Sequence, residues 1–379
     1  MSPHRAIPSI GVLSIAWASL LGLLVSSSGL AAEPSEYEQY MIELVNRARL
    51  DPEGEVTRLG TGNLNEGPPS LNGWPYTIPS GPKQPLAVNA AIVDATVGYA
   101  QLMNDTDTFC HTCFGTSSGD RMWSAGYVPF LSDFNFLQIA GYTLNYGGAP
   151  EPGCSSSCSW ALPGRENIAF HAEWPANGLM DDLLGDVEQT HASLFNDSGV
   201  PGRGHRSTLL YGEWKEIGIG IVEGIDAGGT QDSVYFVQNF AHRSDTGPFL
   251  TGVAYDDLDQ DGFYTPGAGE ALGNITLTVY DAGTNNFVAA GTTLAAGGYS
   301  IELGIGVYDV VASGSALAET YEGVAILGSG PGGIGENTKL DVIPLPEPDA
   351  TLALAAGLLT LGVLKKLRRD PAAARAEAS

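Results

Sequence analysis

The sequence predicts an α+β protein: an α-β-α sandwich, in which helices flank a small antiparallel sheet, followed by a small all-β sandwich domain. Apolar residues recur every three to four positions in three segments, which favours helices, and they alternate with small or polar residues in two later segments, which favours strands. The composition changes after residues 244–248, where short β runs and Gly- and Asp-rich turns begin. A chain of 379 residues is long enough for two domains and terminal segments.

Three helices are predicted in the first domain. Ser35-Glu36-Tyr37-Glu38 forms a capping box, which predicts the start of the first helix at Ser35. The second helix is expected at about residues 90–103 and the third at 179–194, because both segments have one apolar stripe at helical spacing. Residues 60–85 are rich in Pro and Gly and are predicted to form a loop.

Two strands are predicted after the third helix, one around Ile217 to Ile221 and one around Val234 to Phe240. The turn Asp226-Ala227-Gly228-Gly229 between them predicts an antiparallel pair. In the second domain the alternation predicts further strands at 275–280, 287–294, 299–303 and 307–311. Residues 328–345 are rich in Gly and Pro and are expected to be a linker.

The chain is strongly acidic, with 43 acidic against 17 basic side chains and a formal net charge of −26. This charge repels nucleic acid and anionic lipid headgroups and attracts cations. We therefore expect no nucleic-acid partner. The excess of acidic side chains also favours solubility, and solubility is a sufficient explanation for most of the surface charges.

The N-terminus has the organisation of a secretory signal peptide at residues 1–32. His4 and Arg5 precede an apolar run at 10–25, and small residues follow at a plausible cleavage site near Ala32. The alternative is an uncleaved anchor, for which the apolar run is short.

The C-terminus contains Pro346, Glu347 and Pro348, an uncharged segment at 350–364 and a basic block, Lys365-Lys366-Leu367-Arg368-Arg369. The basic block predicts that 350–364 is a transmembrane segment whose C-terminal end lies on the cytoplasmic side. Together, residues 346–369 resemble the PEP-CTERM sorting signal of Gram-negative bacteria, which implies processing by an exosortase. A plain membrane anchor is the alternative. The resemblance implies an exported protein of the Gram-negative cell envelope, surface or extracellular matrix, anchored in the membrane before processing.

Four motifs occur in order along the first domain: Asn46-Arg47-Ala48-Arg49, Phe109-Cys110-His111-Thr112, Gly164-Arg165-Glu166-Asn167-Ile168-Ala169 and Gly204-His205-Arg206. In this order they resemble the bacterial secreted branch of the CAP superfamily (cysteine-rich secretory, antigen 5 and pathogenesis-related-1 proteins), over residues 35–243. The resemblance implies the CAP fold, also called SCP-like, and a cleft with two histidines and two acids. It assigns His111, Glu166 and His205 to that cleft. Glu188 is the candidate for the second acid, and Asp186 is the alternative.

Two imidazoles and two carboxylates in one cleft can bind a divalent metal, with Zn²⁺ favoured by the nitrogen ligands. A structural hydrogen-bond network is the alternative. The resemblance implies a non-enzymatic binder of lipid, glycan or protein ligands, and no catalytic residue is assigned. Two further hypotheses stay open: a metal-dependent hydrolase with Glu166 or Glu188 as general base, and a structural adhesion or matrix protein with an inert cleft.

The four cysteines form two close pairs, Cys110 with Cys113 and Cys154 with Cys158. In an exported chain disulfides are expected more than a zinc site. Four cysteines allow three connectivities. We favour bridges that join the first pair to the second, which would clamp the insertion at 128–163 beside His111.

An acidic run opens the second domain, which spans residues 249–343. Asp257, Asp259 and Asp261, followed by Gly262, match the first half of a Ca²⁺ loop. Ala268 stands at the twelfth position, so the segment is not an EF-hand. Residues 252–273 resemble the B-type repeat of surface adhesins, which implies a Ca²⁺ site that also uses Glu270. A solvated acidic turn is the alternative.

Overall fold

The structure is a computed structural model that describes residues 32–66, 77–128, 164–200, 202–314, 317–328 and 335–344. The chain divides into two compact units, Met1–Leu30 and Ala31–Ser379, and every described residue belongs to the second. The predicted signal peptide, apart from its last residue, and the predicted sorting signal lie outside the described residues. No helix among the described residues is long and apolar enough to cross a membrane.

The first part of the chain is built on a four-stranded sheet in the order β1-β3-β4-β2. The two central strands are antiparallel along their full lengths and are joined by the predicted turn, so that prediction is confirmed. The edge strand β2 is antiparallel to β4, and the short β1 is parallel to β3, so the sheet is mixed and not purely antiparallel. The strands are β1 (Ala87–Val88), β2 (Gly164–Glu173), β3 (Glu216–Ile225) and β4 (Asp232–Ala241).

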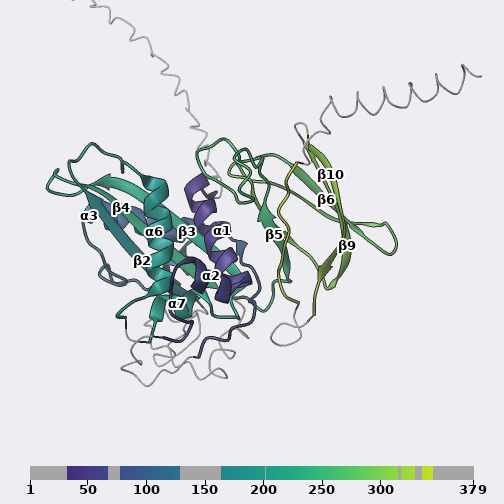
Figure 1. Ribbon diagram of the computed structural model, residues 1–379, viewed down its shortest axis with the longest axis horizontal. Helices are drawn as coiled ribbons and strands as arrows, with labels where there is room; N and C mark the ends of the chain where they lie inside the picture. The colour runs from purple at the N-terminus through teal and green to yellow at the C-terminus, as the bar shows by residue number, and fades with distance from the viewer. Residues whose placement is uncertain are drawn as a thin grey trace, which may run out of the picture. The chain divides into compact units, whose positions relative to one another are not determined.

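Helices lie on both faces of this sheet (Figure 1). Two of them, α1 and α6, pack on one face, and α3 packs on the other. The capping box at Ser35 is present at the start of α1, as expected. The helices are α1 (Glu36–Leu50), α2 (Pro52–Arg58), α3 (Ala90–Thr106), α4 (Ser118–Ser124), α6 (Leu183–Asn196) and α7 (Gly204–Leu209).

Alternate residues of β3 point to opposite faces of the sheet and pack against different helices. Ile217 and Ile219 are fully buried in the core shared with α1. Gly218 and Gly220 face α3, where an added Cβ would lie 2.4 Å from the backbone carbon of Ile92 and 2.5 Å from that of Thr96. Because those distances are below any real Cβ contact, the two glycines let α3 rest directly on the strand backbone.

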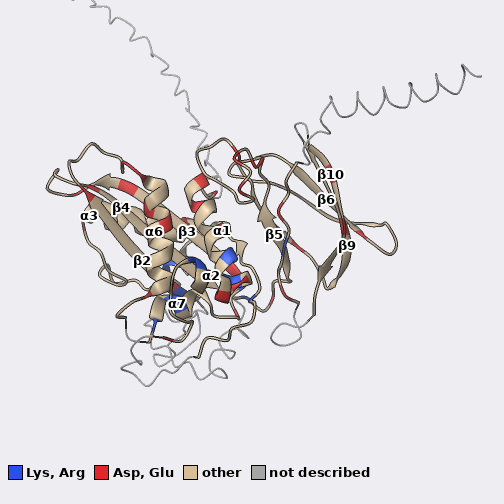
Figure 2. Cartoon of the chain, in the orientation of Figure 1, with Lys and Arg blue, Asp and Glu red and all other residues tan. Residues whose placement is uncertain are grey.

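Two buried arginines tie the segments of this part together. Arg49 is fully buried and donates hydrogen bonds to the carbonyls of Gln84, Leu209 and Tyr211, at 2.9, 2.7 and 2.9 Å. Arg206 is also fully buried and donates to backbone carbonyls of the loop after α2 and of the end of α6. Figure 2 shows Lys and Arg gathered around α1, α2 and α7, whereas Asp and Glu are spread over the described chain, including α1 and α2.

The second part of the chain contains two sheets that share one apolar core. The orders are β10-β9-β6-β7 and β11-β5-β8. All four strands predicted here are present, with ends shifted by up to three residues, whereas β5, β10 and β11 were not predicted. The strands are β5 (Phe249–Val253), β6 (Thr276–Asp281), β7 (Phe287–Thr292), β8 (Gly298–Glu302), β9 (Gly306–Gly314), β10 (Leu317–Ile326) and β11 (Thr338–Lys339).

Residues 335–344 are not the free linker that their composition predicted. β11 pairs in parallel with β5, and Val342 is fully buried. Lys339 forms an ion pair with Glu43 of α1 at 2.8 Å, and the Asn337 side chain donates to the Lys215 carbonyl at 2.7 Å. The Gly and Pro content of the segment predicted a linker. That prediction was wrong because local composition carries no information about distant partners such as β5 and Glu43.

Candidate functional site

A polar cavity of about 370 Å³ lies where the loop after α3, the start of β2 and α7 meet. Three of the predicted cleft residues, His111, Glu166 and His205, line it together. Its volume is within the range of pockets that hold small ligands. The other lining residues are Thr112, Ser118, Arg165, Asn167, Gly204 and Thr208.

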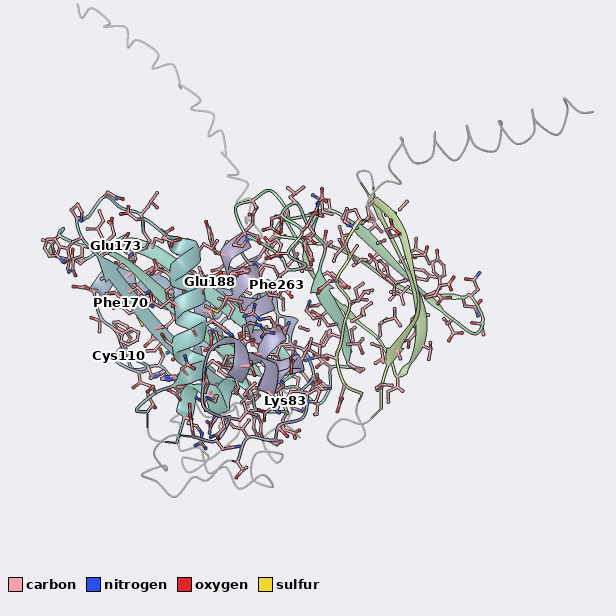
Figure 3. The ribbon with its side chains drawn as sticks, viewed as in Figure 1. Lys83, Cys110, Phe170, Glu173, Glu188 and Phe263 are labelled. Atoms are coloured by element: carbon pink, nitrogen blue, oxygen red, sulfur yellow. A yellow bond between two sulfur atoms is a disulfide. The ribbon has the colours of Figure 1, made fainter. Side chains whose placement is uncertain are left out.

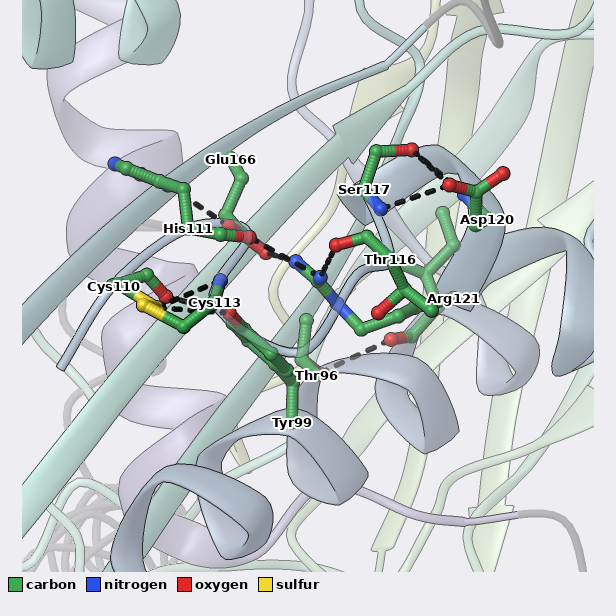
Figure 4. A network of polar contacts seen from close by, with 11 residues as sticks. Thr96, Tyr99, Cys110, His111, Cys113, Thr116, Ser117, Asp120, Arg121 and Glu166 are labelled. Atoms are coloured by element: carbon green, nitrogen blue, oxygen red, sulfur yellow. Dashed lines mark hydrogen bonds and ion pairs between the residues drawn. A yellow bond between two sulfur atoms is a disulfide. The ribbon is translucent and has the colours of Figure 1, made fainter. Parts of the chain in front are cut away.

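Glu166 is held from both sides at the start of β2. The Nδ1 atom of His111 lies 2.9 Å from its Oε1, and Arg121 of α4 forms an ion pair with its Oε2 (Figure 4). The guanidinium carbon of Arg121 lies 3.4 Å from the ring centroid of Tyr99, a close cation–π contact. The Glu166 side chain is only 4% exposed, so its carboxylate serves mainly to orient its two partners.

His205 has a carboxylate partner of its own, Asp197. Its backbone N–H donates to Asp197 Oδ2 at 2.9 Å, and its Nδ1 lies 2.8 Å from Oδ1. Asp197 is buried at the C-cap of α6 in the left-handed conformation, with φ of 48°. Asp197, which was not among the predicted site residues, is thus the carboxylate that holds the second cleft imidazole. Its position eight residues before His205, just after an apolar helical stripe, was the available signal.

Glu188, predicted as the second cleft acid, does not line the cavity. Its Oε1 accepts a hydrogen bond of 2.8 Å from the Tyr40 hydroxyl of α1. Figure 3 shows Glu188 on α6 on the side of Phe263, far from Cys110. The cleft meets α6 only at its C-terminal end, and for this reason a residue in the middle of the helix does not reach it.

Asp186, the alternative acid, belongs to a separate chain of hydrogen bonds between α6 and β2. Its Oδ1 lies 2.7 Å from His171 Nδ1, and His171 Nε2 lies 3.1 Å from the Thr190 hydroxyl. A hydroxyl, an imidazole and a carboxylate in this order also form the catalytic triad of hydrolases. Thr190 is fully buried, however, so no substrate can reach its hydroxyl. The three residues connect the helix to the strand.

The cleft residues fit a protein-bound zinc ion only in part. A carboxylate holds Nδ1 of both His111 and His205 and leaves Nε2 for a ligand, as in many metal sites. Zinc sites, however, use three or four protein ligands. Among the described residues, three such ligand atoms within 4.8 Å of one another occur at Asp257, Asp259 and Glu270, and not in this cleft.

The disulfide in the structure is not one of those that we favoured. Cys110 is bonded to Cys113, with a Cα–Cα distance of 5.9 Å, and so neither reaches the second pair. A bridge between near neighbours closes a much smaller loop than a bridge across the insertion. Cys154 and Cys158 lie outside the described residues.

The acidic loop of the second part brings together three of the four predicted calcium ligands. Oxygens of Asp257, Asp259 and Glu270 lie within 4.8 Å of one another. Asp261 is not in this group; its Oδ1 accepts the backbone N–H of Phe263 at 2.7 Å. Glu270 is fully buried and accepts backbone N–H groups with both oxygens, at 3.1 and 2.7 Å.

No family model matches the chain, and a search of curated proteins finds no match either. Among solved structures, the chain is similar to an extracellular protein containing an SCP domain from Bacillus anthracis str. Ames, with 16% identity and a TM-score of 0.25. That likeness covers 55% of this chain and 40% of the other. An outer surface protein from Borrelia burgdorferi is similar at 14% identity and a TM-score of 0.28, over 56% of this chain and 97% of the other.

Proposed function

We propose that the protein is an exported CAP-type protein that binds a polar ligand in the cleft lined by His111, Glu166 and His205. The order of its sequence motifs supports the CAP assignment, and its termini support export with exosortase processing at the cell envelope. In this proposal the protein is a binder at the surface or in the extracellular matrix, and not an enzyme.

The carboxylate partner of each cleft imidazole is the observation that carries this proposal. Because Glu166 and Asp197 hold Nδ1 of the two rings, the Nε2 atoms are oriented but have no hydrogen-bond partner among the described residues. Oriented polar atoms in a cavity gain most from a ligand that supplies matching hydrogen bonds. They are a costly environment for an acyl chain.

The lining favours a glycan over the other ligand classes. Besides the imidazoles, the polar residues Thr112, Ser118, Arg165, Asn167 and Thr208 line the cavity. Such groups match the alternating donors and acceptors of sugar hydroxyls. A hydrolase is less well supported, because both oxygens of Glu166 are engaged by His111 and Arg121 and a general base needs a free one.

Binding of neutral oligosaccharides to the full chain tests the proposal. On an array of such glycans, with phosphatidylcholine vesicles as the lipid comparison, the wild-type protein is expected to bind at least one glycan. His111→Ala and His205→Ala should each weaken that binding about five- to thirtyfold, since a lost hydrogen bond to a ligand costs about 1–2 kcal/mol.

His171→Ala is the matched control, because His171 is also paired with a carboxylate but lies outside the cavity. It should leave binding unchanged. Full glycan binding by the His111→Ala/His205→Ala double variant would rule out the cleft as the binding site. Binding to the vesicles alone would replace the glycan with a lipid ligand.

A separate observation supports a calcium ion in the second part of the chain. Hard oxygen ligands are what Ca²⁺ prefers, and ligand oxygens on one such ion lie about 3–5 Å apart. Asp257, Asp259 and Glu270 offer three oxygens within 4.8 Å. We propose that these residues hold Ca²⁺ and that the ion stabilises the loop between β5 and β6.

Calcium is then expected to raise the melting temperature, and chelation to lower it. A ligand at about 100 times its Kd stabilises the folded state by about 2.7 kcal/mol. Asp257→Asn/Asp259→Asn should abolish this calcium-dependent rise. Asp281→Asn, in a different acidic turn between β6 and β7, is the control that should retain it. A melting temperature that does not respond to calcium in the wild type would refute the site.

A further inference from the structure

The accessibility and the surroundings of the Cys110–Cys113 disulfide favour its reduction. We propose that Cys110–Cys113 is a thiol–disulfide exchange site for a dithiol reductant, and that its oxidation state controls whether His111 stays in place at the cleft. This inference does not depend on which ligand the cleft binds.

The bridge is accessible and closes a very small loop. It joins cysteines three residues apart in Cys110-His111-Thr112-Cys113, just after α3. Cys113 is exposed, as are both residues between the cysteines, and Cys110 is half-buried. A bridge of this span restricts the unfolded chain less than one that closes a long loop, so its loss costs less stability. Its opening therefore leaves the fold intact, and solvent reaches the outer sulfur.

Groups around the inner sulfur are arranged to accept the charge of a leaving thiolate. The backbone N–H of Cys113 donates to Cys110 Sγ at 2.9 Å. The Tyr99 hydroxyl donates to the Cys110 carbonyl at 2.6 Å and lies 4.0 Å from the same sulfur, and the Arg121 guanidinium is stacked on the Tyr99 ring. Figure 4 shows these groups gathered around the bridge. Cys110 is therefore the better leaving sulfur, and the exposed Cys113 is the sulfur open to attack.

The exchange proceeds in two balanced steps. A thiolate of the dithiol attacks Cys113 Sγ; a mixed disulfide forms, the Cys110–Cys113 bond breaks, and Cys110 leaves as a thiolate. The second thiolate of the reductant then attacks its own sulfur in the mixed disulfide and releases Cys113. The reductant becomes a cyclic or internal disulfide, two electrons pass to the protein, and two protons complete the protein thiols.

His111 is coupled to this reaction because it lies inside the bridged loop. Its side chain is 51% exposed, so little packing holds it. Its contacts are the Glu166 carboxylate at 2.9 Å and, at its own carbonyl, an Arg121 N–H at 3.3 Å. Opening the bridge frees the backbone on both sides of His111, whereas Glu166 keeps its ion pair with Arg121. The reduced protein thus has one oriented imidazole fewer at the cleft.

The other cleft imidazole is independent of the bridge. His205 is fixed by Asp197 and by its place at the start of α7, on a different segment of the chain. It therefore serves as an internal control within the same molecule. Reduction should move the His111 ring and leave the His205 ring unchanged.

The test equilibrates the full chain in graded mixtures of reduced and oxidised dithiothreitol. After acid quenching and alkylation, peptide mass spectrometry gives the reduced fraction at Cys110 and Cys113, separately from Cys154 and Cys158. Ring-nitrogen NMR signals of His111 and His205 are followed in parallel, and far-UV circular dichroism monitors the fold. The expected result is reversible, complete reduction in the folded protein, with the His111 signals shifting in step and those of His205 fixed.

Two outcomes overturn the proposal. One is reduction at Cys110 and Cys113 that occurs only after guanidinium has unfolded the protein. The other is reduction in the folded state with unchanged His111 signals. A Cys110→Ser/Cys113→Ser variant provides a second route, because it cannot form the bridge. Its His111 signals should match those of the reduced wild type, and a match to the oxidised protein would contradict the coupling.

Discussion

Replacing Arg49 with methionine is expected to lower the free energy of unfolding by at least about 3 kcal/mol, because each buried acceptor left without a donor costs about 1–3 kcal/mol. Three backbone carbonyls, those of Gln84, Leu209 and Tyr211, would lose the guanidinium that now binds them. Methionine is similar in length and apolar, so it fills much of the space but donates nothing. Urea unfolding followed by circular dichroism measures the loss.

Two further variants separate this explanation from a general effect of lost charge. Arg243→Met removes an arginine whose ion-pair partner is the partly exposed Asp245, with side chains 25% and 32% exposed, and it should cost less than about 1 kcal/mol. Arg49→Lys keeps the charge but has a single ammonium group, so it can satisfy fewer of the carbonyls and should be intermediate. Equal losses for Arg49→Met and Arg243→Met would show that the carbonyl contacts do not stabilise the fold.

Glu55→Gln is expected to reduce the acid dependence of stability. Burial by itself would raise the pKa of Glu55, but hydrogen bonds from His191 and Arg47 outweigh it and lower the pKa from 4.5 to about 2. A pKa below that of the unfolded chain means that the stabilisation is complete above pH 4.5 and is lost as the pH falls towards 2. The difference corresponds to on the order of 3 kcal/mol.

His191 acts in the same direction. It is fully buried, and burial lowers its pKa, so the ring is neutral and donates its Nε2 proton to Glu55 at 2.8 Å. Acid must therefore both protonate Glu55 and charge the buried ring, and each step favours the unfolded chain, which takes up these protons more readily. Stability should begin to fall below about pH 6.5 and fall most steeply between pH 4.5 and 2.

Urea unfolding at a series of pH values tests this directly. The Glu55→Gln variant should be less stable than the wild type at about pH 7, and the two curves should converge as the pH approaches about 2. Glu53→Gln, an exposed acid on the same helix, should leave the curve unchanged. Parallel curves for wild type and Glu55→Gln would show that another group controls acid unfolding.

Elements that depend on local patterns were predictable from the sequence. The capping box at Ser35, the periodic segments of α3 and α6, and the β3–β4 hairpin all depend on residues close together in the chain. In contrast β2 was not predicted as a strand, because it is an edge strand whose partner β4 lies far along the chain, with Gly164 opposite Ala241. Strand pairs of that kind depend on contacts that no local pattern records.

The same limit explains the outcome at the cleft. His111, Glu166 and His205 stood out because they are polar residues in short motifs. Asp197 and Arg121 did not, since each has its role only through a partner, His205 or Glu166, that the fold brings to it. Glu188 was chosen because it lies on one stripe of the predicted helix. The sequence did not show that α1 packs against that stripe, where Tyr40 binds Glu188.

The ion pair between Lys339 and Glu43 has a consequence for how this chain can be divided. Tyr255 and Tyr264, from beyond the boundary drawn at 244–248, belong to the same core as α1. A fragment that stops at residue 243 would expose that apolar surface and leave the fully buried Glu43 carboxylate without its cation. The β-rich part thus supplies core residues and a buried ion-pair partner to the N-terminal part. For this reason we do not expect recombination to exchange either part alone as an independent module.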